Sequence, residues 1–352
     1  MSPATTCMDT RRVLICEDSQ TYAAGLSRLL SRDPEIEVVG ICPSAEDTIS
    51  RLATMDPVPH LVTMDLELPG MSGGQAIEQI MSTTPVPILV LSGRAGGPST
   101  IAASLGAGAL EVLSKDALDL RDPDGAGAEA FRRRVKVLSN VRVVRHPRAR
   151  LGSNGGAAGS GVTAHRASVI GICASAGGPQ ALVTVLGQLP AGYPIPILVV
   201  QHIASGFVEG FARWLDDQVP VGVRVAEAGR VRPGVWVAPG GTHLRFSGGR
   251  MQLDDEGDGG HHKPSGDALL NSIAAGAGPT GVAVVLTGMG RDGANGFEAV
   301  GRAGGLTIAQ DQASSAVFGM PKAAGERGAD LVLAPLAIGR RLAALSAAVP
   351  VT

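Results

Sequence analysis

The chain has 352 residues, 44% of them hydrophobic, so it is long enough and apolar enough to form two domains with separate cores. Its formal net charge of −2 favours neither a general nucleic-acid binder nor a protein with an acidic tail. Aromatic residues make up only 3% while glycine occurs 49 times, which suits an α/β fold with many tight turns. Because the net charge is close to zero, we expect no nucleic-acid partner.

No segment of the sequence predicts export or insertion into a membrane. The first nine residues show no basic region followed by an apolar run, and apolar runs such as 195–200 are far too short to span a bilayer. The cysteines lack Cys-x-x-Cys spacing, and three of them lie in or beside apolar runs, which indicates reduced thiols in a core. They are Cys7, Cys16, Cys42 and Cys173. We expect a cytoplasmic protein without membrane insertion.

Residues 11–143 form the first predicted domain, in which apolar strands alternate with helices. The predicted strands cover 13–16, 37–42, 61–64, 88–91 and 109–113. The predicted helices cover 22–30, 45–53, 74–81 and 100–105. Five strands that alternate with helices predict a doubly wound α/β domain, with a parallel sheet covered on both faces.

Polar side chains stand at the carboxyl ends of these otherwise apolar strands. They are Glu17, Asp18, Asp65, Ser92 and Lys115. Strand ends of this kind converge at one edge of an open sheet, where three carboxylates repel one another unless a divalent cation binds, and all-oxygen ligands suit Mg²⁺. Asp65 could then attack a phosphoryl group whose oxygens Lys115 and Ser92 hold. Each residue alone could be an ordinary helix cap, but five together favour a site.

The segment that begins at Asp65 reads Asp-Leu-Glu-Leu-Pro-Gly-Met-Ser-Gly and resembles the phosphoacceptor loop of two-component receiver domains. The resemblance implies that a sensor histidine kinase phosphorylates Asp65, that the acidic pair holds Mg²⁺ with it, and that Ser92 and Lys115 are the switch residues. Two positions depart from the family. Asp116 replaces the proline that usually follows the lysine, and Val112 replaces an aromatic residue, so the backbone turn and the aromatic switch of the family are in question.

A last helix and a linker follow the first domain. The helix is expected from about residue 127, with Asp124 as its cap and with basic residues on a solvated face. These basic residues are Arg132, Arg133, Arg134 and Lys136. Residues 144–165 form the predicted linker, because 148–163 are rich in Gly, Ser and Ala and offer almost no core-forming side chains. We expect a flexible tether that lets two domains dock and separate.

Residues 166–348 form the second predicted domain, which again alternates strands and helices. The predicted strands cover 169–173, 195–200, 282–286 and 306–310, and the predicted helices cover 179–189 and 294–300. Residues 236–238 and 244–253 lie around glycine-rich turns and predict an antiparallel hairpin at the sheet edge, with His243 at the surface. We expect a larger, mostly parallel α/β domain.

Ser175, His202 and Asp292 each follow the carboxyl end of a predicted strand, where three side chains can reach one crevice. His202 could take the proton from Ser175, Asp292 could orient the imidazole, and the glycine-rich backbone could supply oxyanion donors. Each residue also has a structural interpretation, and Asp311 competes with Asp292 for the acid role.

The glycine turn beside Ser175 has two other interpretations. A dinucleotide site is weak, because the glycines lack Gly-x-Gly-x-x-Gly spacing and the next strand ends in Gln201-His202 rather than in an acid for a ribose. The nucleophile elbow of α/β-hydrolases does not fit either, since Cys173 stands where a glycine is expected. The triad remains the stronger hypothesis.

Six short blocks across this domain resemble the chemotaxis protein-glutamate methylesterase. They are 174–178, 201–202, 238–240, 262–265, 286–293 and 318–321. The resemblance implies that Ser175 is the nucleophile, His202 the base and Asp292 the orienting acid, and that Met289 contributes its backbone to the oxyanion site. Ala176 stands where the family usually has threonine, so a side-chain contribution is lost while the N–H remains.

Residues 262–265 bear on the walls of the predicted crevice. His262 and the pair Pro264-Ser265 are expected to line it, although Ser265 could equally well cap the helix that runs through Ile273. No cluster of His and Cys has the spacing of a metal site. We therefore expect Mg²⁺ in the first domain and no cofactor in the second.

Taken together, the two resemblances imply a phosphorylation-gated protein-glutamate methylesterase that acts on methyl-accepting chemoreceptors and also deamidates receptor glutamines. The unphosphorylated first domain would cover the crevice, and phosphorylated Asp65 would shift the docking equilibrium. A receiver joined to a non-catalytic output module is the alternative. Against a DNA-binding output, no helix-turn-helix with a basic recognition face is visible in the second domain.

Overall fold

Contacts divide the chain into two units, Met1–His146 and Pro147–Thr352, in the computed structural model of the protein. The structure describes residues 10–93, 98–141, 143, 165–255 and 262–347. The predicted linker lies almost wholly outside these residues, as does Cys7, and the domain limits of 11–143 and 166–348 stay predictions. Among the described helices, none combines the length and hydropathy that a membrane span requires.

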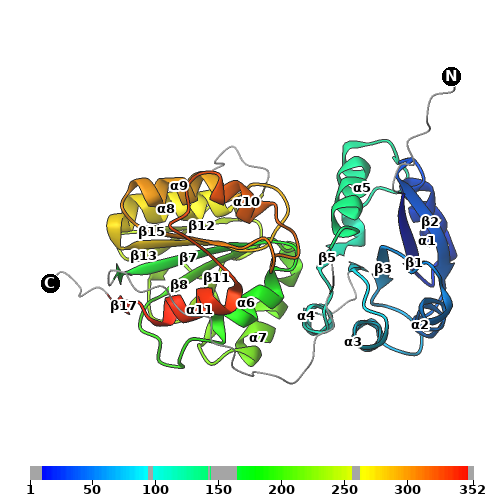
Figure 1. The fold of residues 1–352 in the computed structure, drawn as a ribbon, viewed down its shortest axis with the longest axis horizontal. Coiled ribbons are helices and arrows are strands. Elements are labelled where there is room, and N and C mark those ends of the chain that lie inside the picture. The colour runs from blue at the N-terminus through cyan, green and yellow to red at the C-terminus, as the bar shows by residue number, and fades with distance from the viewer. Residues whose placement is uncertain (1–9, 94–97, 142, 144–164, 256–261, 348–352) are drawn as a thin grey trace. The chain divides into compact units, whose positions relative to one another are not determined.

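The first unit contains the five-stranded parallel sheet that its apolar runs predict, in the order β2-β1-β3-β4-β5 (Figure 1). Its strands are β1 (Arg11–Cys16), β2 (Ile36–Cys42), β3 (Leu61–Asp65), β4 (Ile88–Ser92) and β5 (Glu111–Ser114). Its helices are α1 (Gln20–Leu30), α2 (Ala45–Thr54), α3 (Gly73–Thr83), α4 (Pro98–Gly106) and α5 (Ala126–Leu138). β3 and β4 are buried along their whole length, which confirms a sheet covered on both faces.

Serine caps fix where the first helices of this unit begin. Ser19, Ser44 and Ser72 each accept a hydrogen bond from a backbone N–H in the first turn of α1, α2 and α3. The cap expected for α5 is wrong: Gly125 is its N-cap and makes no side-chain cap bond, while the Asp124 carboxylate lies 3.6 Å from Arg32 Nε. The Asp124 side chain thus pairs with Arg32, in the turn after α1, and does not cap α5.

The basic side chains of α5 pair with acids of the same unit. Arg133 pairs with Glu129, Arg134 with Glu111, and Lys136 with both Asp33 and Glu35. The Arg132 guanidinium donates to the carbonyl oxygens of Leu29 and Pro123. These contacts attach α5 to the rest of the unit.

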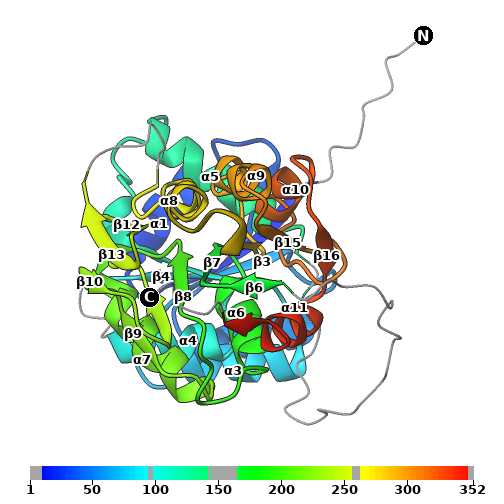
Figure 2. The same cartoon turned by 90° about the vertical axis from the view of Figure 1, so that its left-hand side faces the viewer.

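The second unit is built on seven parallel strands in the order β16-β15-β14-β7-β8-β11-β9. The strands are β7 (Val169–Ala174), β8 (Ile197–Gln201), β9 (Val223–Val225), β11 (Val235–Val237), β14 (Gly281–Val285), β15 (Leu306–Gln310) and β16 (Leu331–Leu333). The helices are α6 (Gly178–Leu186), α7 (Val208–Gln218), α8 (Gly266–Ala277), α9 (Ala294–Arg302), α10 (Met320–Gly325) and α11 (Pro335–Ala343). In Figure 1, α8, α9 and α10 cover one face of the sheet and α6, α7 and α11 the other, and Figure 2 shows the same layers from the side.

The predicted hairpin is present, but it belongs to a separate sheet. β12 (His243–Ser247) and β13 (Arg250–Asp254) pair antiparallel, and β10 (Gly229–Arg230) adds a third strand. Trp236, expected in the hairpin, lies instead in β11, which pairs parallel with β8 and β9. Two further short strands, β6 (Arg166–Ala167) and β17 (Ser346–Ala347), pair with each other.

The chain order of the central strands places the crevice of the second unit. β8 follows β7 on one side of it, whereas β14 lies on the other side. In open α/β sheets, ligands bind beyond the carboxyl ends of the strands where the order reverses in this way. The loops after β7, β8 and β14 therefore meet at one edge of the sheet.

Candidate active site

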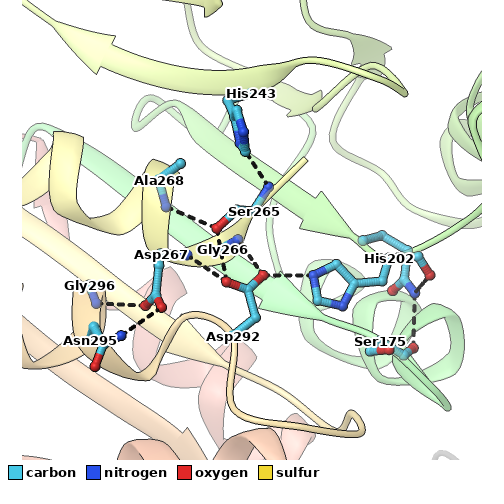
Figure 3. A network of polar contacts seen from close by, with 11 residues as sticks. Ser175, His202, His243, Ser265, Gly266, Asp267, Ala268, Asp292, Asn295 and Gly296 are labelled. Carbon is cyan, nitrogen blue, oxygen red and sulfur yellow. Dashed lines mark hydrogen bonds and ion pairs between the residues drawn. The ribbon is translucent and has the colours of Figure 1, made fainter. Parts of the chain in front are cut away.

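Ser175, His202 and Asp292 lie on the three loops that follow β7, β8 and β14 (Figure 3). The His202 N–H donates to the carbonyl oxygen of Ala174 (2.9 Å), which ties the second loop to the first. The Gln201 amide donates to the carbonyl oxygens of both Ser175 (2.9 Å) and His202 (3.1 Å). Gln201, quoted in the sequence only as part of a motif, therefore holds the serine and histidine segments together.

The turn around Ser175 depends on glycine. Gly177 has φ 73° and is the N-cap of α6, a backbone conformation that favours glycine. At Gly178 a Cβ would stand 2.2 Å from Gln201 Oε1, so a larger residue would displace that amide. Ser175 itself is only 3% exposed, and its N–H donates to the carbonyl oxygen of Thr287 (3.0 Å). The Ser175 N–H bond to Thr287 and the Gln201 bond to the Ser175 carbonyl oxygen hold the serine just before the first turn of α6.

The His202 ring contacts Asp292 through Nε2, at 2.8 Å from Oδ2, and both side chains are 10% exposed. Its other nitrogen, Nδ1, is buried and has no hydrogen-bond partner among the described residues. No hydrogen bond joins the Ser175 hydroxyl to this ring in the described contacts. The imidazole is thus oriented by the acid and keeps one nitrogen free.

Four donors surround the Asp292 carboxylate. Besides His202, they are the Ser265 hydroxyl (2.9 Å), the Gly266 N–H (2.6 Å) and the Asp267 N–H (3.1 Å). The last two belong to the first turn of α8, whose N-terminus favours a negative charge. Burial alone would raise the pKa of Asp292, but the hydrogen bonds from His202 and from α8 outweigh it and hold this pKa well below its usual range.

Helices α8 and α9 exchange carboxylates, because the first turn of each helix donates hydrogen bonds to an aspartate at the start of the other. Asp267 in the first turn of α8 accepts from the Gly296 N–H (2.8 Å) and the Asn295 amide (3.0 Å) of α9, while Asp292 precedes α9 and caps α8. Burial, and then the charge of Asp292, raises the pKa of Asp267. Neither Asp267 nor Asn295 was predicted from the sequence, because the exchange joins segments far apart in the chain.

The backbone around Ala176 and Met289 offers two N–H groups near the serine. Neither group donates to an acceptor in the hydrogen bonds of the described residues. A Cβ on Gly288 would stand 2.8 Å from the Ser175 Cβ, so the loop residue before Met289 lies directly against the serine. The Thr287 hydroxyl donates to the Ala176 carbonyl oxygen (2.9 Å) and fixes the two segments together.

Three other predicted residues have clear places in the structure. Asp311 accepts from the Ser314 N–H and hydroxyl within its own turn, and has no bond to His202 in the described contacts. The ring of His262 stacks on that of His202, with centroids 4.1 Å apart and an interplanar angle of 12°. Ser265 both caps α8, accepting from the Ala268 N–H, and donates to Asp292.

The expectation that His243 lies at the surface is wrong. It is 2% exposed, and its Nδ1 accepts from the Ser265 N–H (3.3 Å). Its strand, β12, packs against α8, which covers the side chain. The sequence showed only a polar residue near a glycine turn, and the packing of a separate sheet buried it.

The acidic residues predicted in the first unit also come together. Oxygen atoms of Glu17, Asp18 and Asp65 lie within 4.8 Å of one another. Lys115 Nζ lies 2.7 Å from both Glu17 and Asp65. The Ser92 side chain is buried, and its hydroxyl donates to the carbonyl oxygen of Gly93 (3.3 Å).

Charges in this acidic pocket are only partly balanced. Burial raises the pKa of Glu17, the contact with Lys115 works against that shift, and the charge of Asp65 adds to it. Burial alone would lower the pKa of Lys115, but its bonds to both carboxylates raise it. Lys115 opens a short 3-10 turn, η1 (Lys115–Ala117), in which the Asp116 N–H donates to the Ser114 hydroxyl (3.3 Å). A serine cap thus forms the turn at which most receivers place proline.

Comparison with known proteins identifies two families along the chain. Residues 170–342 match the CheB methylesterase family, and residues 13–122 match the response regulator receiver domain family. Over 343 residues the chain is 44% identical to a protein of Anaeromyxobacter dehalogenans named protein-glutamate methylesterase/protein-glutamine glutaminase 3, and the match covers 94% of this chain and 98% of that protein. The chain belongs to the CheB methylesterase family.

Two further similarities extend along this CheB-type chain. A Myxococcus xanthus protein with the same name is 41% identical, over 89% of this chain and 87% of the relative. Among solved structures, the catalytic domain of the Thermotoga maritima CheB methylesterase is 38% identical, with a TM-score of 0.48, over 50% of this chain and 97% of that one. The fold class expected from the sequence, two doubly wound α/β domains, is confirmed.

Proposed function

We propose that this hydrolase removes methyl groups from methylated glutamate side chains of chemoreceptors and also deamidates their glutamines. The observation that carries the proposal is the state of His202, whose Nε2 contacts Asp292 while its buried Nδ1 has no hydrogen-bond partner among the described residues. A serine hydrolase needs an oriented imidazole that can accept a proton beside its serine. His202 offers this, and Ser175 lies in the neighbouring loop, just before α6.

Acylation begins at the Ser175 hydroxyl. Its oxygen attacks the ester carbonyl carbon while its proton passes to His202 Nδ1, and Asp292 stabilises the imidazolium through Nε2. The negative charge on the carbonyl oxygen is met by the N–H groups of Ala176 and Met289, which have no other acceptor in the described bonds. The methoxy group then leaves with the imidazolium proton as methanol, and a glutamyl ester of Ser175 remains.

Deacylation repeats these steps with water as the nucleophile. His202 takes one proton from the water, the remaining hydroxide adds to the glutamyl ester, and the proton passes to the Ser175 oxygen as the ester bond breaks. The product leaves as the glutamic acid side chain, which then loses its proton to water. With a glutamine substrate the leaving group of the first step is ammonia instead of methanol. The same residues therefore serve both reactions.

Methanol release from membranes that carry methylated chemoreceptors tests this proposal. We expect wild-type protein to release methanol and Ser175→Ala to release none above background. Asp311→Asn is a matched control, because Asp311 follows β15 at the same edge of the sheet and, in the described contacts, its carboxylate accepts only from Ser314. Equal release by wild type and Ser175→Ala would contradict the esterase.

We further propose that the first unit takes a phosphoryl group on Asp65 from a sensor histidine kinase, with Mg²⁺ as cofactor. The three carboxylates within 4.8 Å of one another offer the oxygen ligands that Mg²⁺ prefers. Bound there, the metal would neutralise charge on the phosphoryl oxygens. Asp65 supplies the attacking oxygen, and Lys115 and Ser92 stand ready for the other phosphoryl oxygens.

Phosphorylation of Asp65 would act as a gate on the esterase. Two units on a linker can dock and separate, and a new charge on one of them shifts that equilibrium. A shift from 1:99 to 99:1 needs about 5.5 kcal/mol, so we expect partial activation. Both the kinase and the receptor tails act in the cytoplasm, where we place the protein.

The gate is tested by methanol release with and without acetyl phosphate and Mg²⁺. Wild type should be stimulated, whereas Asp65→Ala should keep its basal rate and lose the stimulation. Stimulation that survives in Asp65→Ala would rule out this residue as the acceptor.

A further inference from the structure

Tyr22 lies against the acidic pocket of the first unit and has no part in the chemistry described above. It stands in the first turn of α1, where its N–H donates to the Ser19 hydroxyl (3.3 Å). Lys115 Nζ lies 4.5 Å from the centroid of its ring. Only Tyr22 and Phe131 are aromatic in the sequence from 11 to 143, and Phe131 is buried within α5. Tyr22 therefore supplies the aromatic face beside Lys115.

The ring completes the surroundings of the Lys115 ammonium. This group has three N–H donors, and two directions are taken by Glu17 and Asp65, each at 2.7 Å. The same nitrogen also lies over the Tyr22 ring. The Lys115 side chain is only 18% exposed, and a cation over an aromatic face is held more strongly when it is removed from water.

The three contacts of Lys115 differ in what a divalent cation does to them. Mg²⁺ takes oxygen ligands, so it competes with Lys115 for Glu17 and Asp65. An aromatic ring is no ligand for such a hard cation, so the contact with Tyr22 persists when the metal binds. The ring is thus the partner that can keep the ammonium in place while its carboxylate partners change.

The ring rather than the hydroxyl of Tyr22 carries this effect. The hydroxyl oxygen is buried and has no hydrogen-bond partner in the described part of the chain. Burial, and then the charges of Glu17 and Asp65, raises the pKa of Tyr22, so the hydroxyl stays neutral. Phenylalanine should therefore replace tyrosine without loss, whereas an aliphatic side chain should not.

We propose that Tyr22 is a positioning residue that holds Lys115 in place for phosphoryl transfer to Asp65. The ammonium then meets the incoming phosphoryl oxygens without first searching for its position. Val112 cannot supply an aromatic face, although the receiver resemblance expects an aromatic residue there, because its buried side chain is aliphatic. This inference rests on the proposed phosphorylation of Asp65.

A first test needs neither metal nor phosphate. In the full-length chain, the ε-methylene NMR resonance of Lys115 is assigned by its loss in Lys115→Arg. We expect a ring-current shift in wild type and in Tyr22→Phe, and its loss in Tyr22→Leu. An unchanged resonance in Tyr22→Leu would show that the ring does not face the ammonium.

The second test measures the rate of phosphate uptake from acetyl phosphate in saturating Mg²⁺. Tyr22→Leu should lower the maximal rate by about threefold to tenfold, while Tyr22→Phe should match wild type. In a Lys115→Met background, Tyr22→Leu should have no further effect, because the ring acts through the lysine. An effect of the same size in that background would overturn the proposal.

Failure of the two proposals can be told apart. Wild-type protein that takes up no phosphate would refute phosphorylation of Asp65, and with it the role of Tyr22. Normal uptake in wild type that Tyr22→Leu does not slow would refute the role of Tyr22 alone.

Discussion

Two buried carboxylate sites stand at the carboxyl edges of two parallel sheets, and they are built in opposite ways. Asp292 is surrounded by four donors, and these outweigh burial to keep its pKa low. Glu17 and Asp65 share Lys115, and in the described part of the chain each accepts from one backbone N–H, that of Ser19 and that of Glu67. Burial accordingly raises the pKa of Glu17.

The difference fits the roles that we propose for these carboxylates. An acid that orients an imidazole works best when its charge and direction never change, and a ring of fixed donors secures both. A pocket that receives a metal and a phosphoryl group must leave its oxygens available, so a flexible lysine balances them in the meantime. A full set of hydrogen-bond donors thus suits the orienting role proposed for Asp292. Partial neutralisation by one lysine suits the proposed exchange of partners at Glu17 and Asp65.

The largest expected effect comes from removing the charge of the saturated site. Asp292→Asn can accept through only one oxygen, and its amide faces N–H donors instead of balancing them. By analogy with the same change in serine proteases, kcat should fall by about 10⁴. Methanol release from methylated receptor membranes measures it, with Asp311→Asn as control. A kcat within about threefold of wild type would remove Asp292 from the mechanism.

The opposite site should respond to loss of its lysine by binding metal more tightly. Lys115→Met removes the cation that competes with Mg²⁺ for Glu17 and Asp65, so we expect Mg²⁺ affinity to rise by about tenfold. Without Mg²⁺ the unpaired carboxylates should lower the thermal midpoint. Titration of the midpoint with Mg²⁺ checks both. Arg133→Met, which breaks an exposed pair with Glu129, should show neither change.

A smaller effect should separate the two roles of Ser265. Ser265→Ala loses the cap of α8, which costs about 1 kcal/mol, and also one donor to Asp292. We expect kcat to fall by roughly tenfold with KM unchanged, because the loss is felt in the orientation of His202. Ser72→Ala is the matched control, since it removes a similar serine cap from α3, which belongs to the first unit. Equal kcat in the two variants would leave Ser265 as a cap only.

Local patterns in the sequence predicted most of the longer elements of the first unit and the polar residues that end its strands, whereas α7 and α11 of the second unit were missed. Apolar runs such as 282–286 gave strands, and the polar residue after each run fell at the sheet edge. Strands of three residues, such as β9 and β16, were missed because so short a run carries no periodicity. Trp236 was placed in the hairpin for the same reason.

What the sequence could not show was which distant segments share a hydrogen bond. The exchange of Asp267 and Asp292 between α8 and α9 needs the packing of two helices, and burial of His243 needs the small sheet. Tyr22 and Lys115 are far apart in the chain, and no spacing rule connects them. Side chains of this kind become visible only when the fold brings their segments together.

The smallest expected effect is the pH dependence of the free energy of unfolding of the second unit. Its sign should be opposite for Asp292 and for Asp267. Both tryptophans, Trp214 and Trp236, lie in the second unit, so urea unfolding followed by their fluorescence reports that unit alone. Asp292 has a lowered pKa in the folded chain, so its stabilisation is present above the unfolded value of about 3.9 and is lost as pH falls through the folded one. The stability lost in Asp292→Asn should therefore be constant near neutral pH and shrink below about pH 4.

Asp267 should show the reverse. Its folded pKa is raised, so its contribution is largest below the unfolded value of about 3.9 and falls as pH rises through the folded one. Asp267→Asn should gain stability relative to wild type as pH rises above about 4. Over the same pH range the stability lost in Asp292→Asn should already be at its maximum and constant. Parallel trends in the two variants would mean that the exchange between α8 and α9 does not separate the two acids. Opposite trends would show that the donors around Asp292, and not burial, decide which carboxylate keeps its charge.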